Sequence, residues 1–177
     1  MDSSTAKLMA EYNSFANGKM NGFLAKLNDG QWNREFPGYF KTTRSICNHL
    51  YISDFTWLRR FSGLRKFSYA ADELMGEKIE FGMSIVGDPA DYVAKRGKLD
   101  TLLLRFSLEI TPQDIGSVLS YKDSHGNGHI KNFGGLVMHM FNHETHHRGM
   151  ISLYLENLGF ENDFNSLSEM IPEEKGQ

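Results

Sequence analysis

A stretch of fifteen residues, Met138-His-Met-Phe-Asn-His-Glu-Thr-His-His-Arg-Gly-Met-Ile-Ser152, decides the fold. It carries four of the seven histidines in the chain, and apolar residues recur around it at the spacing of an α-helix. Residues four apart on a helix face the same way, with Cβ atoms about 5–6 Å apart. We therefore expect a helix over residues 134–158, with His139, His143 and His147 in one column along it.

Two histidines of this column are expected to bind a metal ion, because zinc–imidazole bonds of roughly 2.0–2.1 Å let His143 and His147 reach one ion. Two ligands from one helix hold a metal weakly, so a third must come from elsewhere. His49 is the candidate, since it lies on an otherwise apolar face of a predicted helix. A lone histidine there is more often a hydrogen-bonded core residue, but the pair on a second helix favours a shared metal site.

The three-histidine centre limits the choice of metal and the type of site. Three neutral imidazoles suit a divalent transition metal such as Zn, Ni, Fe or Cu, and affinity alone does not choose among them. Three protein ligands leave positions open for water or substrate, which is typical of catalytic rather than structural sites.

The same helix also matches His-Glu-x-x-His, the zinc metalloprotease motif in which the glutamate is the general base. Glu144 would then be catalytic, with Glu161 or Glu169 as the third ligand. The pentamer is short, and its extended Gly-x-x-His continuation is absent. Glu144 also points about 100° away from the histidine column. We therefore expect Glu144 to have a surface or helix–helix role.

Other residues near the motif are expected to support the fold or the site. His139 is expected to pack beside the site or to act as an outer partner of a ligand, and His146 to be exposed or between helices. Arg148 is expected to pair with a carboxylate, and Gly149 to permit close approach of another helix. Cys47 is expected to be a buried, inert thiol.

The whole chain fits one all-α domain. Apolar periodicity predicts four long helices with a small β-hairpin before the last one, a pattern typical of a four-helix bundle, in which metal sites are built from facing helices. His125 and His129 flank the hairpin turn and are expected to be polar surface residues rather than a second metal site. The expected spans are helices at 4–27, 42–63, 88–108 and 134–158, strands at 115–122 and 129–133, and a loop at 67–87 with a helical turn near 71–75.

Composition narrows the class of protein further. With 177 residues, we expect one domain over 1–160 and a tail over 161–177 that packs on the bundle or frays. A single cysteine excludes a disulfide framework and favours a reducing, cytoplasmic location. A net charge of −3 gives no reason to expect nucleic-acid binding, and no apolar run approaches the ~18 residues of a membrane span.

A basic stretch stands out against this acidic balance. Between Lys41 and Lys66, lysine and arginine outnumber acidic residues six to one. Such a stretch is usually a solvated face of a helix, and the alternative is a surface for an anionic ligand or partner.

Three segments of the chain resemble the DinB family of metal-binding proteins, which includes the YfiT-like group. Residues 12–17 (Tyr-Asn-x-Phe-Ala-Asn) resemble the family's opening, with Phe15 in place of tryptophan. Residues 46–60 resemble the helix that supplies the first metal histidine. Residues 139–149 resemble the closing signature, which supplies two more, although Met150 replaces the family's usual glutamine.

This resemblance covers nearly the whole chain and implies a four-helix bundle of up-down-down-up type. It also implies a metal centre of His49, His143 and His147, and often a homodimer. Relatives in the family include thiol-dependent S-transferases and a maleylpyruvate isomerase, which use low-molecular-weight thiols. The family does not share a single reaction.

Two functions of different classes follow. The first is a metal-dependent enzyme acting on small molecules, of thiol S-transferase or hydrolase type, with a thiol as a possible partner. The alternative is a non-catalytic, metal-stabilised protein that binds a ligand or serves a stress response. Direct DNA binding is a weaker idea, because the chain is acidic and carries no DNA-binding motif.

Overall fold

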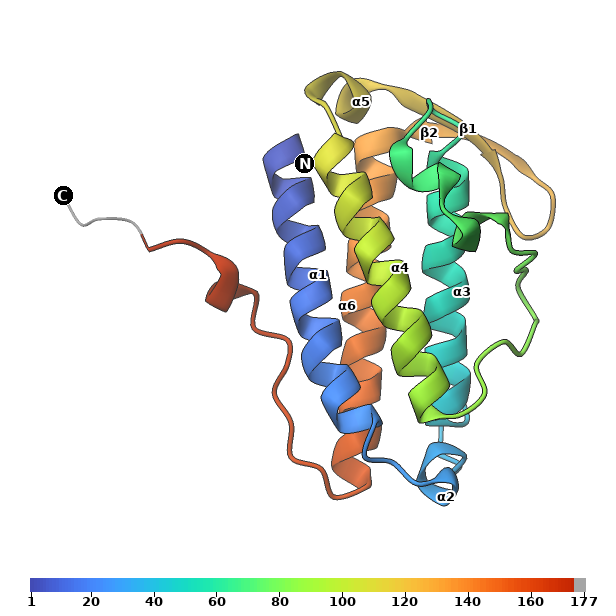
Figure 1. Cartoon of the computed structure of the whole chain (residues 1–177), viewed down its shortest axis with the longest axis vertical. Helices are drawn as coiled ribbons and strands as arrows, with labels where there is room; N and C mark the ends of the chain where they lie inside the picture. Colours follow the sequence, from blue (N-terminus) through green and yellow to red (C-terminus); the bar gives the residue numbers. More distant parts are fainter. Residues whose placement is uncertain (174–177) are drawn as a thin grey trace.

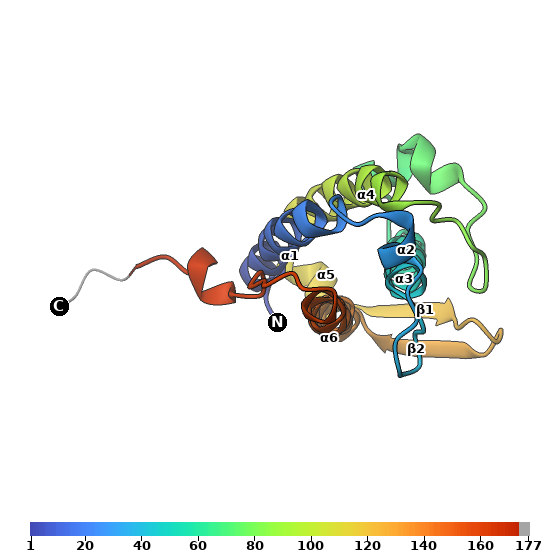
Figure 2. The same cartoon turned by 90° about the horizontal axis from the view of Figure 1, so that it is seen from below.

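Four long helices pack side by side in the computed structural model, which describes residues 1–173. Around the bundle the order is α1, α4, α3 and α6, as the views along and across the axis show (Figures 1 and 2). α1 and α6 run in one direction and α3 and α4 in the other (Figure 1). The predicted four-helix bundle of up-down-down-up type is therefore confirmed. Its helices are α1 (Ser3–Leu24), α3 (Thr43–Phe61), α4 (Pro89–Glu109) and α6 (Phe133–Asn157).

Each long helix begins at a polar side chain that accepts a hydrogen bond from the backbone N–H of the third helical residue. Such caps satisfy an N–H group that has no partner within the helix, and each typically contributes about 1 kcal/mol. The sequence therefore fixes where each helix begins, more sharply than apolar periodicity alone does. The capping residues are Asp2, Thr42, Asp88 and Asn132.

Two short helices lie where a stop and a strand were predicted. Asn28 does not end the first helix region in a turn but caps α2 (Asp29–Trp32), through a reciprocal capping box with Gln31. Thr111 caps α5 (Pro112–Gly116) in the same way, so the strand predicted from residue 115 begins later. The hairpin itself is confirmed, with β1 (Val118–Lys122) antiparallel to β2 (Gly128–Asn132).

The long connection between α3 and α4 is tied to the bundle by aromatic residues. It contains two 3₁₀ turns, η1 (Ser68–Ala71) and η2 (Glu73–Gly76), where a single turn was predicted. Phe67 and Tyr69 are buried, and the Tyr69 hydroxyl donates a 2.8 Å hydrogen bond to the carbonyl oxygen of Leu58. This connection allows α3 and α4 to run parallel, since parallel neighbours need a crossover.

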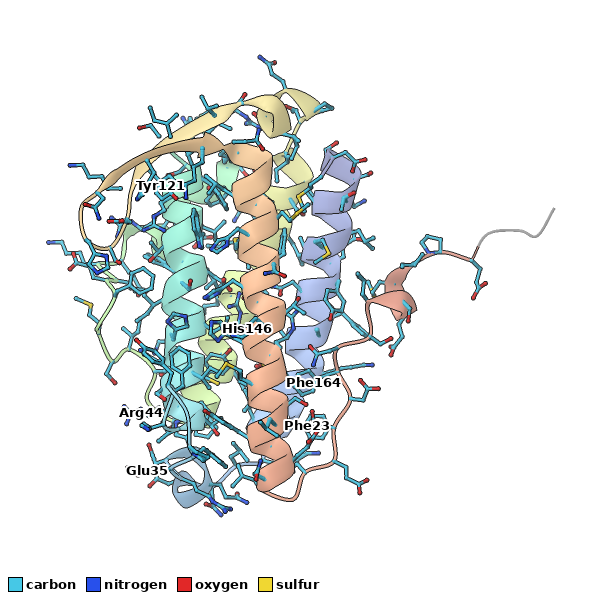
Figure 3. The ribbon with its side chains drawn as sticks, turned by 180° about the vertical axis from the view of Figure 1, so that it is seen from behind. Phe23, Glu35, Arg44, Tyr121, His146 and Phe164 are labelled. Carbon is cyan, nitrogen blue, oxygen red and sulfur yellow. The ribbon has the colours of Figure 1, made fainter. Side chains whose placement is uncertain are left out.

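The segment after α6 turns back along α1 and leads into η3 (Leu167–Met170). The ring of Phe164 is buried and lies 6.2 Å from that of Phe23, and Figure 3 shows the two side by side. The Tyr12 hydroxyl donates a 3.0 Å hydrogen bond to the carbonyl oxygen of Asn165. The first residues of the expected tail thus pack on the bundle.

Within residues 1–173, no helix combines the length and apolar character that crossing a membrane requires.

Candidate metal centre

Three imidazoles converge between α3 and α6. The Nε2 atom of His143 lies 3.1 Å from Nε2 of His49 and 2.9 Å from Nε2 of His147. The three candidate ligand atoms all lie within 4.8 Å of one another. Bonds of roughly 2.0–2.1 Å to one ion would place ligand atoms about 2.8–3.4 Å apart, for angles between 90° and tetrahedral. Both distances from His143 lie in this range, so its ring and each of its two neighbours are placed to share a metal ion.

All three rings are neutral at physiological pH. Burial lowers the pKa of His49, and burial together with neighbouring imidazoles lowers the pKa of His143 to about 4 and of His147 to about 3. Metal binding requires the neutral imidazole. The site therefore presents its ligands in the form that a metal takes, without a proton having to leave first.

The second nitrogens of two rings have no hydrogen-bond partner. Nδ1 of His143 and Nδ1 of His147 are buried and unpaired within the described residues. A neutral ring carries its proton on one nitrogen, so an Nε2 ligand places that proton on Nδ1. Many metal-binding histidines donate this proton to a carboxylate or carbonyl. Here the rings are held by packing instead.

One aromatic residue of the loop after α2, Phe40, covers one side of the histidines. The ring of Phe40 lies 4.8 Å from that of His49 and 5.3 Å from that of His147. The hydroxyl of Tyr154 donates a hydrogen bond to the carbonyl oxygen of Phe40 and fixes the loop on α6. Phe40 therefore shields this side from water.

The other side of the centre is open. His49 lines a surface cavity of about 460 Å³ whose far wall is the segment 81–84. Asn48, next to His49, holds that segment by two hydrogen bonds. Its side-chain NH₂ group donates to the carbonyl oxygen of Met83 at 2.8 Å, and its side-chain oxygen accepts from the backbone N–H of Ile85 at 2.9 Å. A small molecule in this cavity can therefore reach His49, the one histidine of the triad that lines it.

The residues that follow the two α6 histidines of the triad enter a buried charge cluster. Glu144 follows His143 and accepts hydrogen bonds from Arg96 at 3.0 Å and from Arg148 at 3.1 Å. Arg148 follows His147, so both histidines have a neighbour fixed in the interior. The expected carboxylate partner of Arg148 is thus Glu144, and the expected helix–helix role of Glu144 is confirmed.

Every long helix contributes to this cluster. Asp54 of α3 accepts a 2.6 Å hydrogen bond from Arg96 of α4. Asp100 of α4 also pairs with Arg96, and it accepts a 3.0 Å hydrogen bond from Asn17 of α1. Three carboxylates therefore face two guanidinium groups. Burial raises the pKa of Asp54 to about 6. A buried charge without a partner is costly, so these pairs favour one way of packing the four helices against each other.

The protease interpretation is wrong. Glu144 is turned into the core toward two arginines, where it cannot act as a base at the histidines. Glu169 instead pairs with Lys19 at 3.0 Å, and Glu161 is exposed. Within residues 1–173 the only group of three or more possible metal ligands is the histidine triad.

The other histidines lie outside the triad. His139 packs its ring 5.4 Å from that of Trp57, and His146 is exposed, half-way along α6 (Figure 3). His129 pairs with Asp123 at 3.0 Å on the hairpin, and His125 is exposed there. All four take the packing or surface positions that were expected.

One expected role was wrong, and one set of residues was missed. A Cβ added to Gly149 would meet nothing within 4 Å, so this glycine permits no close helix contact, whereas Cys47 is buried as expected. The missed set is the buried charge cluster. A visible signal was the spacing of Arg96 and Asp100, four apart on the face of α4 that also carries Leu99 and Leu103.

Comparisons with known proteins identify the family of the chain. A model of the DinB family matches residues 1–165. The chain is 24% identical over 151 residues to Protein DinB of Bacillus subtilis (strain 168), covering 85% of this chain and 84% of that protein. No solved structure matches the chain. Because the family match spans the whole bundle, including all three converging histidines, the chain belongs to the DinB family.

Proposed function

We propose that His49, His143 and His147 bind one divalent transition metal ion, and that the protein is a metal-dependent enzyme acting on small molecules. The observation that carries this proposal is the convergence of the Nε2 atoms of three neutral imidazoles, one of which, that of His49, lines an open cavity. The reaction proposed is transfer to or from a thiol. The alternative is hydrolysis, in which water takes the place of the thiol as nucleophile. Such an ion, when bound, lowers the pKa of a coordinated thiol or water, which makes it a nucleophile near neutral pH.

The chain's own residues prepare this chemistry. The neutral imidazoles bind without releasing protons, and Phe40 excludes water from one side. The opposite side leaves room for a substrate in a cavity of about 460 Å³. Three protein ligands and an accessible face are the arrangement of catalytic rather than structural metal sites.

Elemental analysis of protein purified without a metal-affinity step tests the metal site and identifies Zn, Ni or Fe. We expect close to one ion per chain in the wild type and a loss of most of that ion in His49→Ala and His143→Ala. His146→Ala is the matched control, because His146 lies on the same helix and is exposed. Equal metal content in His146→Ala and His143→Ala would contradict the site.

Activity is tested by screening low-molecular-weight thiols with electrophilic small molecules, before and after chelation. We expect turnover to stop on chelation and to return with one divalent metal. Turnover that survives His49→Ala, His143→Ala and His147→Ala together would exclude the proposed role of the metal.

A second candidate function is supported by the position of the ligands. His49 lies on α3 and the other two on α6, so an ion would join two helices that are far apart in sequence. The protein would then use the metal for stability and bind a ligand without reaction. If the histidine variants lose only thermal stability, and the screened wild type has no turnover, this second function is favoured.

A further inference from the structure

One stripe of α3 joins the histidines to an arginine. Thr56 and Arg60 follow His49 by seven and eleven residues, so they lie on the same side of the helix, within about 20° of it. With a rise of about 1.5 Å per residue, the Cα atoms of His49 and Arg60 lie roughly 16 Å apart along the axis. A molecule lying along this stripe would touch both residues.

Arg60 is a cation with no salt bridge among the described residues, although the charge of Asp123 acts on it. Its guanidinium group lies 4.7 Å from the ring centre of Trp57 and 5.0 Å from that of Tyr121, which Figure 3 shows on the hairpin beside α3. It is half-buried, and within residues 1–173 no protein group accepts a hydrogen bond from its side chain and no carboxylate lies within salt-bridge distance of it. Burial lowers its pKa. Two aromatic rings therefore hold the side chain in one place, while its N–H donors remain available.

A second cavity surrounds this arginine. Its volume is about 450 Å³, and it lies between α3, the segment 79–81 and the hairpin turn. Its cations are Arg59, Arg60 and Lys122, against Glu80 and Asp123. The carboxylate of Asp123 is already engaged by His129 and by the turn, so the cavity favours an anion.

The two cavities meet at Phe81. This side chain lines both of them, is 41% exposed, and lies 6.3 Å from the ring of His49. The segment that carries it has no regular structure and is held at one end by Asn48. A ligand can therefore extend from His49 past Phe81 to Arg60.

We propose that Arg60 binds the carboxylate of an elongated acidic substrate, whose other end reacts at the histidines. The substrate class is a small molecule with a carboxylate remote from its reacting group. The planar fork of a guanidinium matches the two oxygens of a carboxylate. This proposal rests on the proposed function for the reacting end but not for the acidic end, and the two ends are tested separately.

The acidic end is tested in metal-free protein. The Nε–H resonance of Arg60 is identified by its loss in Arg60→Lys and is followed during titration with glutarate. We expect a saturable shift with glutarate and none with dimethyl glutarate. Absence of a saturable shift overturns the proposal, and tighter binding of inorganic phosphate than of glutarate overturns the assignment to a carboxylate.

The full length of the site is tested in zinc-loaded protein by calorimetry with 8-mercaptooctanoate and its methyl ester. We expect the acid to bind about tenfold or more tightly than the ester, because a hydrogen bond to a charged group is worth at least that factor. Arg60→Gln should abolish the preference while leaving binding of the ester unchanged.

Arg44→Gln is the matched control. Arg44 lines the histidine cavity at the opposite end and already donates to the carbonyl oxygen of Val86 at 2.9 Å. It should keep the preference for the acid, and loss of the preference there instead of in Arg60→Gln overturns the assignment. If the protein takes up no zinc, the proposed function fails, while the metal-free titration still decides whether Arg60 binds a carboxylate.

Discussion

Arg96 of α4 donates a hydrogen bond of 3.0 Å to Glu144 of α6, at a point where neither side chain is exposed to solvent. Removing one partner of such a buried pair costs about 3–5 kcal/mol, because the other charge stays buried and unpaired. We expect Glu144→Ala to lose stability in this range, measured by urea unfolding. Glu144→Gln should lose less, because it keeps a hydrogen-bond acceptor. If the free energy of unfolding of Glu144→Ala equals that of the wild type, the charge cluster does not hold the helices together.

Added metal should stabilise the folded protein. An ion that binds only the folded state stabilises it by about 4 kcal/mol at a thousandfold excess over Kd. For a chain of this size we expect Tm to rise by roughly 10 °C, since each kcal/mol shifts Tm by about 2–4 °C. Thermal unfolding of chelated protein, with and without zinc, measures the rise. His143→Ala should lose it and His146→Ala should keep it; a rise of equal size in both would place the ion elsewhere.

Asp54 gives the buried cluster a pH dependence. Its folded pKa of about 6 lies above the ordinary value of 3.8, so between these values the folded state holds the proton more tightly than the unfolded state. The contribution of Asp54 to stability is therefore present at low pH and lost as the pH rises through about 6. Relative to Asp54→Asn, the wild type should lose up to about 3 kcal/mol between pH 4 and 7.

Urea unfolding at several pH values measures this difference, with Asp114→Asn as the control. The pKa of Asp114 is lowered to about 2, chiefly by its hydrogen bonds with Arg65, so its contribution is lost only below about pH 4. The difference between wild type and Asp114→Asn should thus stay constant from pH 4.5 to 7. A constant difference for Asp54→Asn as well would show that Asp54 is ionised throughout.

Phe40 should control how fast the centre exchanges its ion. The hydrophobic shell around a metal site sets the access of water to it, and outer-shell changes often cost about tenfold or more in affinity. We expect Phe40→Ala to release zinc to a chelator faster than the wild type does, as followed with a colorimetric chelator. Tyr39→Ala is the matched control, because Tyr39 is the neighbour of Phe40 in the chain and is 87% exposed. Equal release rates for the two variants would show that Phe40 does not shield the ion.

Two glycines of α6 should respond in opposite directions to alanine. Gly149 has open space around the position of a Cβ, so Gly149→Ala should stabilise the helix by about 0.5–1 kcal/mol. A Cβ on Gly134 would lie 2.9 Å from a methyl carbon of Ile115 and 3.0 Å from its carbonyl oxygen. Gly134→Ala should therefore cost about 1–3 kcal/mol by overpacking. Thermal unfolding of both variants checks the signs.

The sequence predicted the long helices and the hairpin because each is set by local features. Periodic apolar residues and capping side chains define α4, for example, where Asp88 caps and Pro89 opens the helix. The short helices were missed because Asn28-Asp29-Gly30 resembles a turn. Only the reciprocal bond between Asn28 and Gln31 shows that it begins a helix. Such a bond depends on local geometry that periodicity does not contain.

The candidate site divides in the same way. The convergence of His49 with the α6 pair was predictable, because a histidine on an apolar helix face needs a partner. The cluster around Arg96 and Glu144 was not, because it depends on which faces of four helices meet. The Arg60 cavity was also not predictable from the sequence. Its walls come from α3, the connection after α3 and the hairpin, and these segments meet only in the folded chain.

Of the three converging histidines, His49 comes from α3, and His143 and His147 come from α6, the last long helix. A ribosome releases His49 well before His143, so a nascent chain that stops short of α6 carries only one of the three imidazoles of the triad. The proposed binding of a metal ion therefore awaits synthesis of the last long helix, because a shorter chain lacks two of the three histidines.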